Sequence, residues 1–114
     1  IGDYMVSRSG WIGDYADPNT FLDMWVTDGP NNQTKWSNSF FDEGIEKAKY
    51  ESDPTERMEI FRQIEQTLMD EQPIIPIYFY VSTNMVNTRI KGFTANLQDV
   101  HPLHLLSIEP EGSE

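Results

Sequence analysis

Apolar residues recur at helical spacing in the middle of the chain. Residues 39–51 and 54–71 each carry one apolar stripe, with positions three or four apart, which predicts two amphipathic helices. The stripes consist of Phe41, Ile45 and Ala48 in the first segment, and of Phe61, Ile64 and Leu68 in the second. Each stripe needs a partner surface, so we expect the two helices to form a hairpin with one buried side each.

Two Asp-Pro pairs mark the starts of helices. Asp53-Pro54 places a helix-capping aspartate before a proline at the first helical position, and Glu56 follows in capping-box order. Asp17-Pro18 has the same arrangement and predicts a shorter helix that reaches about Val26. The helical part of the chain should therefore contain three helices.

Extended segments lie on both sides of the helices. Residues 3–13 are expected to form a strand, because apolar and polar side chains alternate at its start. Residues 73–81 are a denser apolar run, also expected to be a strand, with two prolines that restrict its place in a sheet. A short strand or turn is expected at 89–93, and a last short strand at 105–108. The predicted fold class is α/β, with a small mixed sheet and a helical hairpin.

The composition excludes several classes of function. The chain has 114 residues and a formal net charge of −11, so a nucleic acid partner is not expected. It has no cysteine, which removes disulfides, thiolate metal sites and cysteine nucleophiles. No motif of a hydrolase, metalloprotease or nucleotide-binding enzyme is present, and we expect neither catalysis nor a cofactor. His101 and His104 flank a proline without further ligands nearby, so they are interpreted as structural or exposed rather than metal-binding.

The segment 8–18 concentrates groups that could bind a ligand. Glycines at 10 and 13 allow a second backbone to come close, and Asp14 follows at the end of the predicted strand. A carboxylate in that position suits an extended ligand with a cationic end. Asp17 fits the role of a helix cap.

The residues alone leave other interpretations of this segment open. For Asp14, a turn or solvent-exposed role is favoured on these grounds. Trp11 could equally be a core residue, and Arg8 a surface charge. Two aspartates three residues apart are more often a cap and a turn residue than the separated carboxylate pair of a glycosidase.

The order of several motifs resembles one protein family. Gly10-Trp11-Ile12-Gly13-Asp14-Tyr15-Ala16-Asp17-Pro18, followed by Phe21-Leu22, is similar to a segment of the oligopeptide-binding lipoproteins. These are the extracellular solute-binding proteins, family 5, of peptide ABC importers. The resemblance covers nearly the whole chain and continues through Asp53 to Arg57, residues 65–69, residues 73–80, Lys91-Gly92-Phe93 and His101-Pro102-Leu103.

This resemblance implies the C-terminal fragment of a two-lobed fold like that of the periplasmic binding proteins. Residues 1–81 would form part of a ligand-binding lobe, and residues 82–114 would cross back to the other lobe. The full-length protein would be lipid-anchored on the extracellular face of the cell membrane, or periplasmic. Its partners would be a peptide ligand and the membrane permease of the importer. Two copies of the fragment are also expected to associate through exposed lobe surface.

The resemblance also implies roles for individual residues. Asp14 matches the aspartate that pairs with the α-ammonium group of the peptide. Gly10 and Ile12 lie on the strand whose backbone pairs with the peptide. The remaining matches are Arg8, at a position that meets the carboxylate of short peptides, and the pocket-lining aromatics Trp11 and Tyr80.

Three alternatives remain. Some relatives with this segment bind nickel, haem, oligosaccharides or other solutes, so a receptor for a non-peptide solute is the first. The second is a hydrolase that uses Asp14 and Asp17. The third is a small acidic domain whose helical hairpin, residues 39–71, docks a partner.

Overall fold

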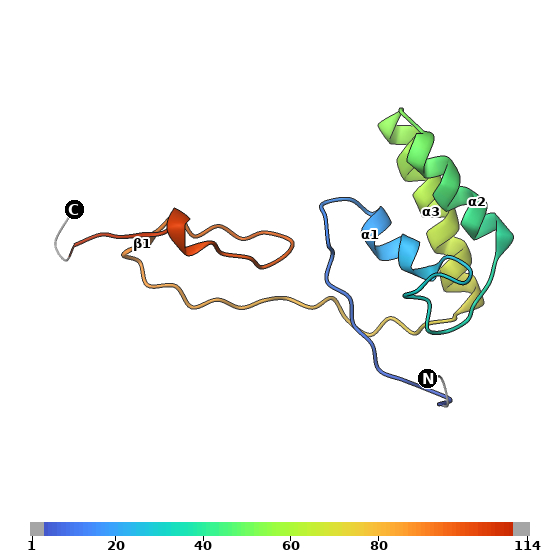
Figure 1. Ribbon diagram of the computed structural model, residues 1–114, viewed down its shortest axis with the longest axis horizontal. Helices are drawn as coiled ribbons and strands as arrows, with labels where there is room; N and C mark the ends of the chain where they lie inside the picture. The colour runs from blue at the N-terminus through green and yellow to red at the C-terminus, as the bar shows by residue number, and fades with distance from the viewer. Residues whose placement is uncertain (1–3, 111–114) are drawn as a thin grey trace. The chain divides into compact units, whose positions relative to one another are not determined.

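A computed structural model describes residues 4–110 of the chain. The chain divides into two units, with the boundary between Ile77 and Tyr78. The first unit contains the helices, and the second contains a small sheet (Figure 1). The boundary falls inside the apolar segment 73–81 and close to the predicted change of lobe at residue 81.

The first unit is organised around two long helices. α2 spans Ser39–Tyr50 and α3 spans Pro54–Glu71, and they lie side by side as an antiparallel pair (Figure 1). Before them come a single turn of helix, α1 (Asn19–Leu22), and the 3₁₀ helix η1 (Asp23–Trp25). The predicted hairpin and the short helix before it are confirmed. Within residues 4–110, no helix is both long enough and apolar enough to cross a membrane.

The core of this unit lies between the helices. It is formed by both predicted stripes together with Leu22 and Ile60. Phe41 has no exposed surface and packs against the edge of the Trp36 ring, with 5.0 Å between ring centroids. The fully buried stripe residues explain why α2 and α3 pair, because burial of this apolar surface is the main stabilising contribution to such a hairpin.

The start of α3 is capped as expected. One carboxylate oxygen of Asp53 accepts hydrogen bonds from the backbone N–H groups of Thr55, at 2.8 Å, and Glu56, at 3.1 Å. The reciprocal half of the capping box is replaced, since the Asp53 N–H donates to the Glu51 side chain. The aspartate cap therefore sets the start of the helix without help from the Glu56 side chain.

α2 lies very close to α3 at Gly44. A Cβ atom at this position would lie 2.2 Å from Cγ2 of Ile64, a buried branched side chain that has little freedom to move. Glycine is a poor helix former, and it is retained here because the neighbouring helix occupies the space of a side chain.

We expect Gly44→Ala to lower the free energy of unfolding by about 1–3 kcal/mol, because overpacking outweighs the gain of about 1 kcal/mol in helix propensity. Chemical denaturation of both proteins measures the difference. Gly10→Ala is the matched control, since no atom lies within 4 Å of its added Cβ. Stabilisation by Gly44→Ala would contradict the tight contact.

The second unit contains a two-stranded antiparallel sheet. β1 (Ile90–Lys91) pairs with β2 (Ser107–Ile108), with Ile90 opposite Ile108. The 3₁₀ helix η2 (Leu103–Leu105) precedes β2. Gly92 follows β1 with a φ angle of +83°, and a Cβ atom there would lie 2.1 Å from the Leu105 carbonyl oxygen. Both the backbone conformation and the close approach of Leu105 therefore require glycine at this position. The two short C-terminal strands are confirmed, but the prediction of a mixed sheet is wrong.

The predicted strands at 3–13 and 73–81 are also not formed. Residue 3 lies outside the described residues, and residues 4–13 and 73–81 are irregular. The only sheet within residues 4–110 joins β1 and β2, so neither segment has a strand beside it. A strand is defined by its hydrogen-bonded neighbour, and an apolar sequence alone cannot supply one.

Candidate functional site

The candidate site is the junction where the N-terminal extended segment meets α1. Gly13 is buried, and the Asp14 backbone N–H donates a hydrogen bond of 3.0 Å to Oγ1 of Thr20. Thr20 is only 1% exposed, so its hydroxyl is a fixed acceptor inside the fold. The backbone of Asp14 is thus attached to the start of the helical unit while the residue itself lies at the surface.

Asp17 caps α1, as predicted. Its carboxylate accepts a hydrogen bond of 2.9 Å from the Asn19 N–H, and Pro18 already has helical backbone angles, with φ −55° and ψ −29°. This is the arrangement of a capping residue followed by proline at the first helical position. Asp17 is therefore engaged in the structure of the helix start.

Asp17 also forms an ion pair with Arg57 of α3. The guanidinium donates from Nη1 to Oδ2 at 2.6 Å and from Nη2 to Oδ1 at 3.0 Å. Its Nε donates to the Ala48 carbonyl at 2.9 Å, and its Cζ lies 4.6 Å from the centre of the Phe61 ring. The hydrogen bonds from Arg57 hold the pKa of the Asp17 carboxyl below its ordinary value.

In the sequence, Arg57 stands among glutamates and outside the apolar stripe of its helix, a setting typical of a solvated residue. The structure turns this side chain toward α1 and α2, where it joins three segments. Arginine suits this role because its planar fork matches both oxygens of one carboxylate.

Tyr15 takes part in a second local network that the sequence did not reveal. Its hydroxyl donates to the Asp23 carboxylate at 3.0 Å and accepts from Nδ2 of Asn19 at 2.9 Å. Burial raises the pKa of the Tyr15 hydroxyl. The spacing of four residues between Tyr15, Asn19 and Asp23 is the signal that could have predicted these contacts.

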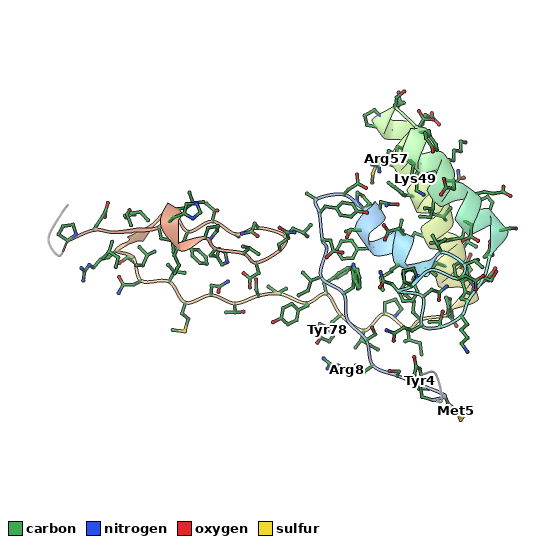
Figure 2. The ribbon with its side chains drawn as sticks, in the orientation of Figure 1. Tyr4, Met5, Arg8, Lys49, Arg57 and Tyr78 are labelled. Carbon is green, nitrogen blue, oxygen red and sulfur yellow. The ribbon has the colours of Figure 1, made fainter. Side chains whose placement is uncertain are left out.

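Four other predicted site residues precede Asp14 on the extended segment. Arg8, Gly10, Trp11 and Ile12 all lie at the surface, and Figure 2 shows Arg8 on this segment with its side chain directed away from the helices. The space beside Gly10 is open. The segment therefore presents accessible backbone that leads directly to Asp14.

Tyr80 lies in the second unit, apart from the other five predicted residues in the sequence, and its side chain is exposed.

In the same unit, His101 stacks on Phe93 with 4.0 Å between ring centroids and lies 2.8 Å from the Asp99 carboxylate. Among residues 4–110, no three histidine, aspartate or glutamate side chains gather as a metal site.

A hollow of about 440 Å³ lies elsewhere in the described chain, between η1, the following loop and α2. Its carboxylates already have partners inside the fold. Asp42 accepts a hydrogen bond from the Thr27 N–H, and Glu46 is paired with Lys49. None of the candidate binding residues lines it, so it does not define the site.

The chain is similar to several curated binding proteins. It is 35% identical over 106 residues to the dipeptide-binding protein DppE of Bacillus subtilis, and this alignment covers 93% of this chain and 19% of the relative. It is 38% identical over 91 residues to the oligopeptide-binding protein OppA of the same organism, and this alignment covers 79% of this chain and 17% of the relative. It is also 30% identical over 92 residues to YgiS of Escherichia coli, a probable deoxycholate-binding periplasmic protein. This alignment covers 81% of this chain and 17% of the relative.

The chain belongs to the family of oligopeptide-binding proteins. No model of a protein family matches it. It spans about a fifth of the length of these relatives. The family relatives are binding proteins rather than enzymes, in agreement with the prediction that the chain does not catalyse a reaction. The similarity extends over both units, because the alignment to DppE covers nearly all of the chain.

Proposed function

We propose that this chain is the ligand-contacting segment of the substrate-binding component of an ABC importer for oligopeptides. The observation that carries the proposal is an exposed segment of accessible backbone that ends in an aspartate attached to the fold through Thr20. That arrangement, in a chain similar to dipeptide- and oligopeptide-binding proteins, suits a peptide with a free amino terminus.

The backbone of the extended segment would bind the main chain of the peptide. Residues 4–12 have no neighbouring strand among the described residues, and the space beside Gly10 is open. A peptide laid along Gly10 and Ile12 would add a strand and satisfy these N–H and C=O groups. Because the contacts are to the main chain, peptides of many sequences would be accepted.

Side chains would then fix the ends of the peptide. Asp14 would pair with the α-ammonium group, which needs an anionic partner once it leaves water. Arg8 would meet the terminal carboxylate of a short peptide. Trp11 and Tyr80 would provide apolar walls for peptide side chains, since both are partly or largely exposed in this chain.

The remaining elements of the proposal concern the full-length protein. Residues 1–81 would belong to a ligand-binding lobe and residues 82–114 to the return into the other lobe. The apolar side chains of Ile75, Ile77 and Phe79 are exposed in the first and second units and would pack against the rest of the receptor, or against a second copy. The receptor would deliver its ligand to a membrane permease, from the periplasm or from a lipid anchor.

A receptor for a non-peptide solute is the second candidate. The observation that favours it is the similarity to YgiS, whose name refers to deoxycholate. Trp11 and Ile12 would offer apolar surface to such a ligand.

Calorimetric titration of the full-length protein distinguishes the two candidates. We expect binding of a tripeptide with a free amino terminus, and N-methylation of its amides to weaken binding by at least about tenfold through lost main-chain hydrogen bonds. A control peptide with shortened side chains should keep most of its affinity. Binding of deoxycholate without binding of any peptide would contradict the peptide proposal.

A further inference from the structure

We propose that Arg57 is a positioning residue for ligand binding, which holds Asp14 in place through Asp17. The inference rests on the proposed function of Asp14 as the anchor for a peptide amino terminus. It adds a residue that touches no ligand, lies 43 positions further along the chain than Asp14, and belongs to a helix outside the candidate binding segment.

Arg57 is itself firmly held. It lies in the first turns of α3, and its side chain contacts the Ala48 carbonyl at the end of α2 and the face of the Phe61 ring. Phe61 belongs to the core. The guanidinium is therefore a fixed extension of the helical hairpin, and its two hydrogen bonds to Asp17 transfer that rigidity to the turn before α1.

The turn that carries Asp14 is attached to α1 and η1 through Thr20 and Tyr15, and Arg57 adds an attachment to α3. Thr20 accepts from the backbone N–H of Asp14, and Arg57 binds the carboxylate of Asp17 three residues later. The ion pair is partly buried, with 28% of the Arg57 side chain and 29% of the Asp17 side chain exposed, so solvent screens it less than a surface pair.

Such an attachment matters for affinity because ordering a flexible carboxylate during binding reduces the net free energy of binding. With Arg57 in place, Asp14 would be preorganised toward the peptide amino group. Without it, the turn would retain the contacts of Thr20 and Tyr15 but lose its attachment to α3. Global folding would depend less on this pair, since Asp53 caps α3 separately and the core lies between the two helices.

Arg57→Lys and Asp17→Asn test the inference in the full-length protein. The asparagine that the second variant introduces is also a good helix cap, so this variant removes the charge while α1 keeps its cap. We expect each to bind a free-amine tripeptide about tenfold more weakly, within the range of coupling between residues that do not contact the ligand. Affinity for the N-acetylated tripeptide should stay unchanged.

Arg62→Lys is the matched control, because Arg62 forms an equivalent ion pair with Glu59 on the exposed face of the same helix. It should alter neither affinity. A cycle with Asp14→Asn adds a readout that a structural role would not move. In the Asp14→Asn background, Arg57→Lys should have no further effect on the free-amine peptide.

Equal losses for the free-amine and acetylated peptides would overturn the positioning role, as would an undiminished effect of Arg57→Lys in the Asp14→Asn background. A preference for free amines that Asp14→Asn removes and Arg57→Lys leaves intact would overturn this inference alone. If Asp14→Asn does not change the affinity for free-amine peptides, the proposed anchor itself fails, and the positioning role with it.

Discussion

Phe41→Ala is expected to lower the free energy of unfolding of the helical unit by about 3–5 kcal/mol, the usual cost of truncating a fully buried aromatic residue. Phe41 has no exposed surface and packs against Trp36 and the facing side of α3. Its removal would lose both apolar burial and packing contacts, and would leave a cavity between the two helices. Chemical denaturation followed by helical circular dichroism measures the loss.

Phe40→Ala provides a matched control in the neighbouring position. Phe40 belongs to the same helix and is the same residue type, but it is 52% exposed. We expect its truncation to cost well under half as much. If Phe41→Ala leaves no folded protein to measure, Phe41→Leu should give a smaller loss, with intermediate stability. Equal effects of the Phe40 and Phe41 truncations would contradict the burial pattern of the hairpin.

The helical hairpin could be predicted because its determinants are local. The stripes on α2 and α3 follow a period that only a helix satisfies, and the Asp53-Pro54 pair fixes a helix start. Asp17 was assigned as a cap for the same local reason, and the structure confirms it. The turn-forming run Asp28-Gly29-Pro30-Asn31-Asn32 between η1 and α2 is a local signal of the same kind and indicates a loop.

The strands predicted at 3–13 and 73–81 are absent because strand formation depends on residues far away in the sequence. Alternation indicates which faces a strand would have, but not whether a neighbour exists to pair with it. Within the described chain no such neighbour is present. The proposed function gives both segments a partner, in the peptide and in the rest of a longer receptor.

The contact between Arg57 and Asp17 was missed for a related reason. It joins residues 40 positions apart, and a helical arginine among glutamates normally indicates a solvated face. By contrast, the place of Asp14 at the end of the N-terminal segment could be predicted from the sequence, because the residues that form the turn are its neighbours along the chain. Its role as an anchor is still inferred from resemblance and chemistry.

Asp14→Asn is expected to weaken the binding of free-amine peptides by about 3–5 kcal/mol, which is more than a hundredfold in affinity. The amide would leave the ammonium group of the peptide in the site without a charged partner. Peptides with an acetylated amino terminus carry no such charge and should lose little. The variant should keep the contact to Thr20, because that contact uses the backbone of Asp14.

Asp28→Asn is the control for a lost carboxylate. Asp28 lies in a turn with a φ angle of +57°, a conformation that asparagine also tolerates, so neither folding nor affinity should change. It lowers the negative charge by the same amount as Asp14→Asn. Any general electrostatic attraction of cationic peptides would therefore appear in both variants.

The most direct measurement is calorimetric titration of the full-length wild type and Asp14→Asn proteins with one tripeptide in free-amine and N-acetylated forms. The account predicts that the wild type prefers the free amine and that Asp14→Asn loses this preference by a selective loss of affinity for that form. Equal affinity of the two proteins for the free-amine peptide would contradict it.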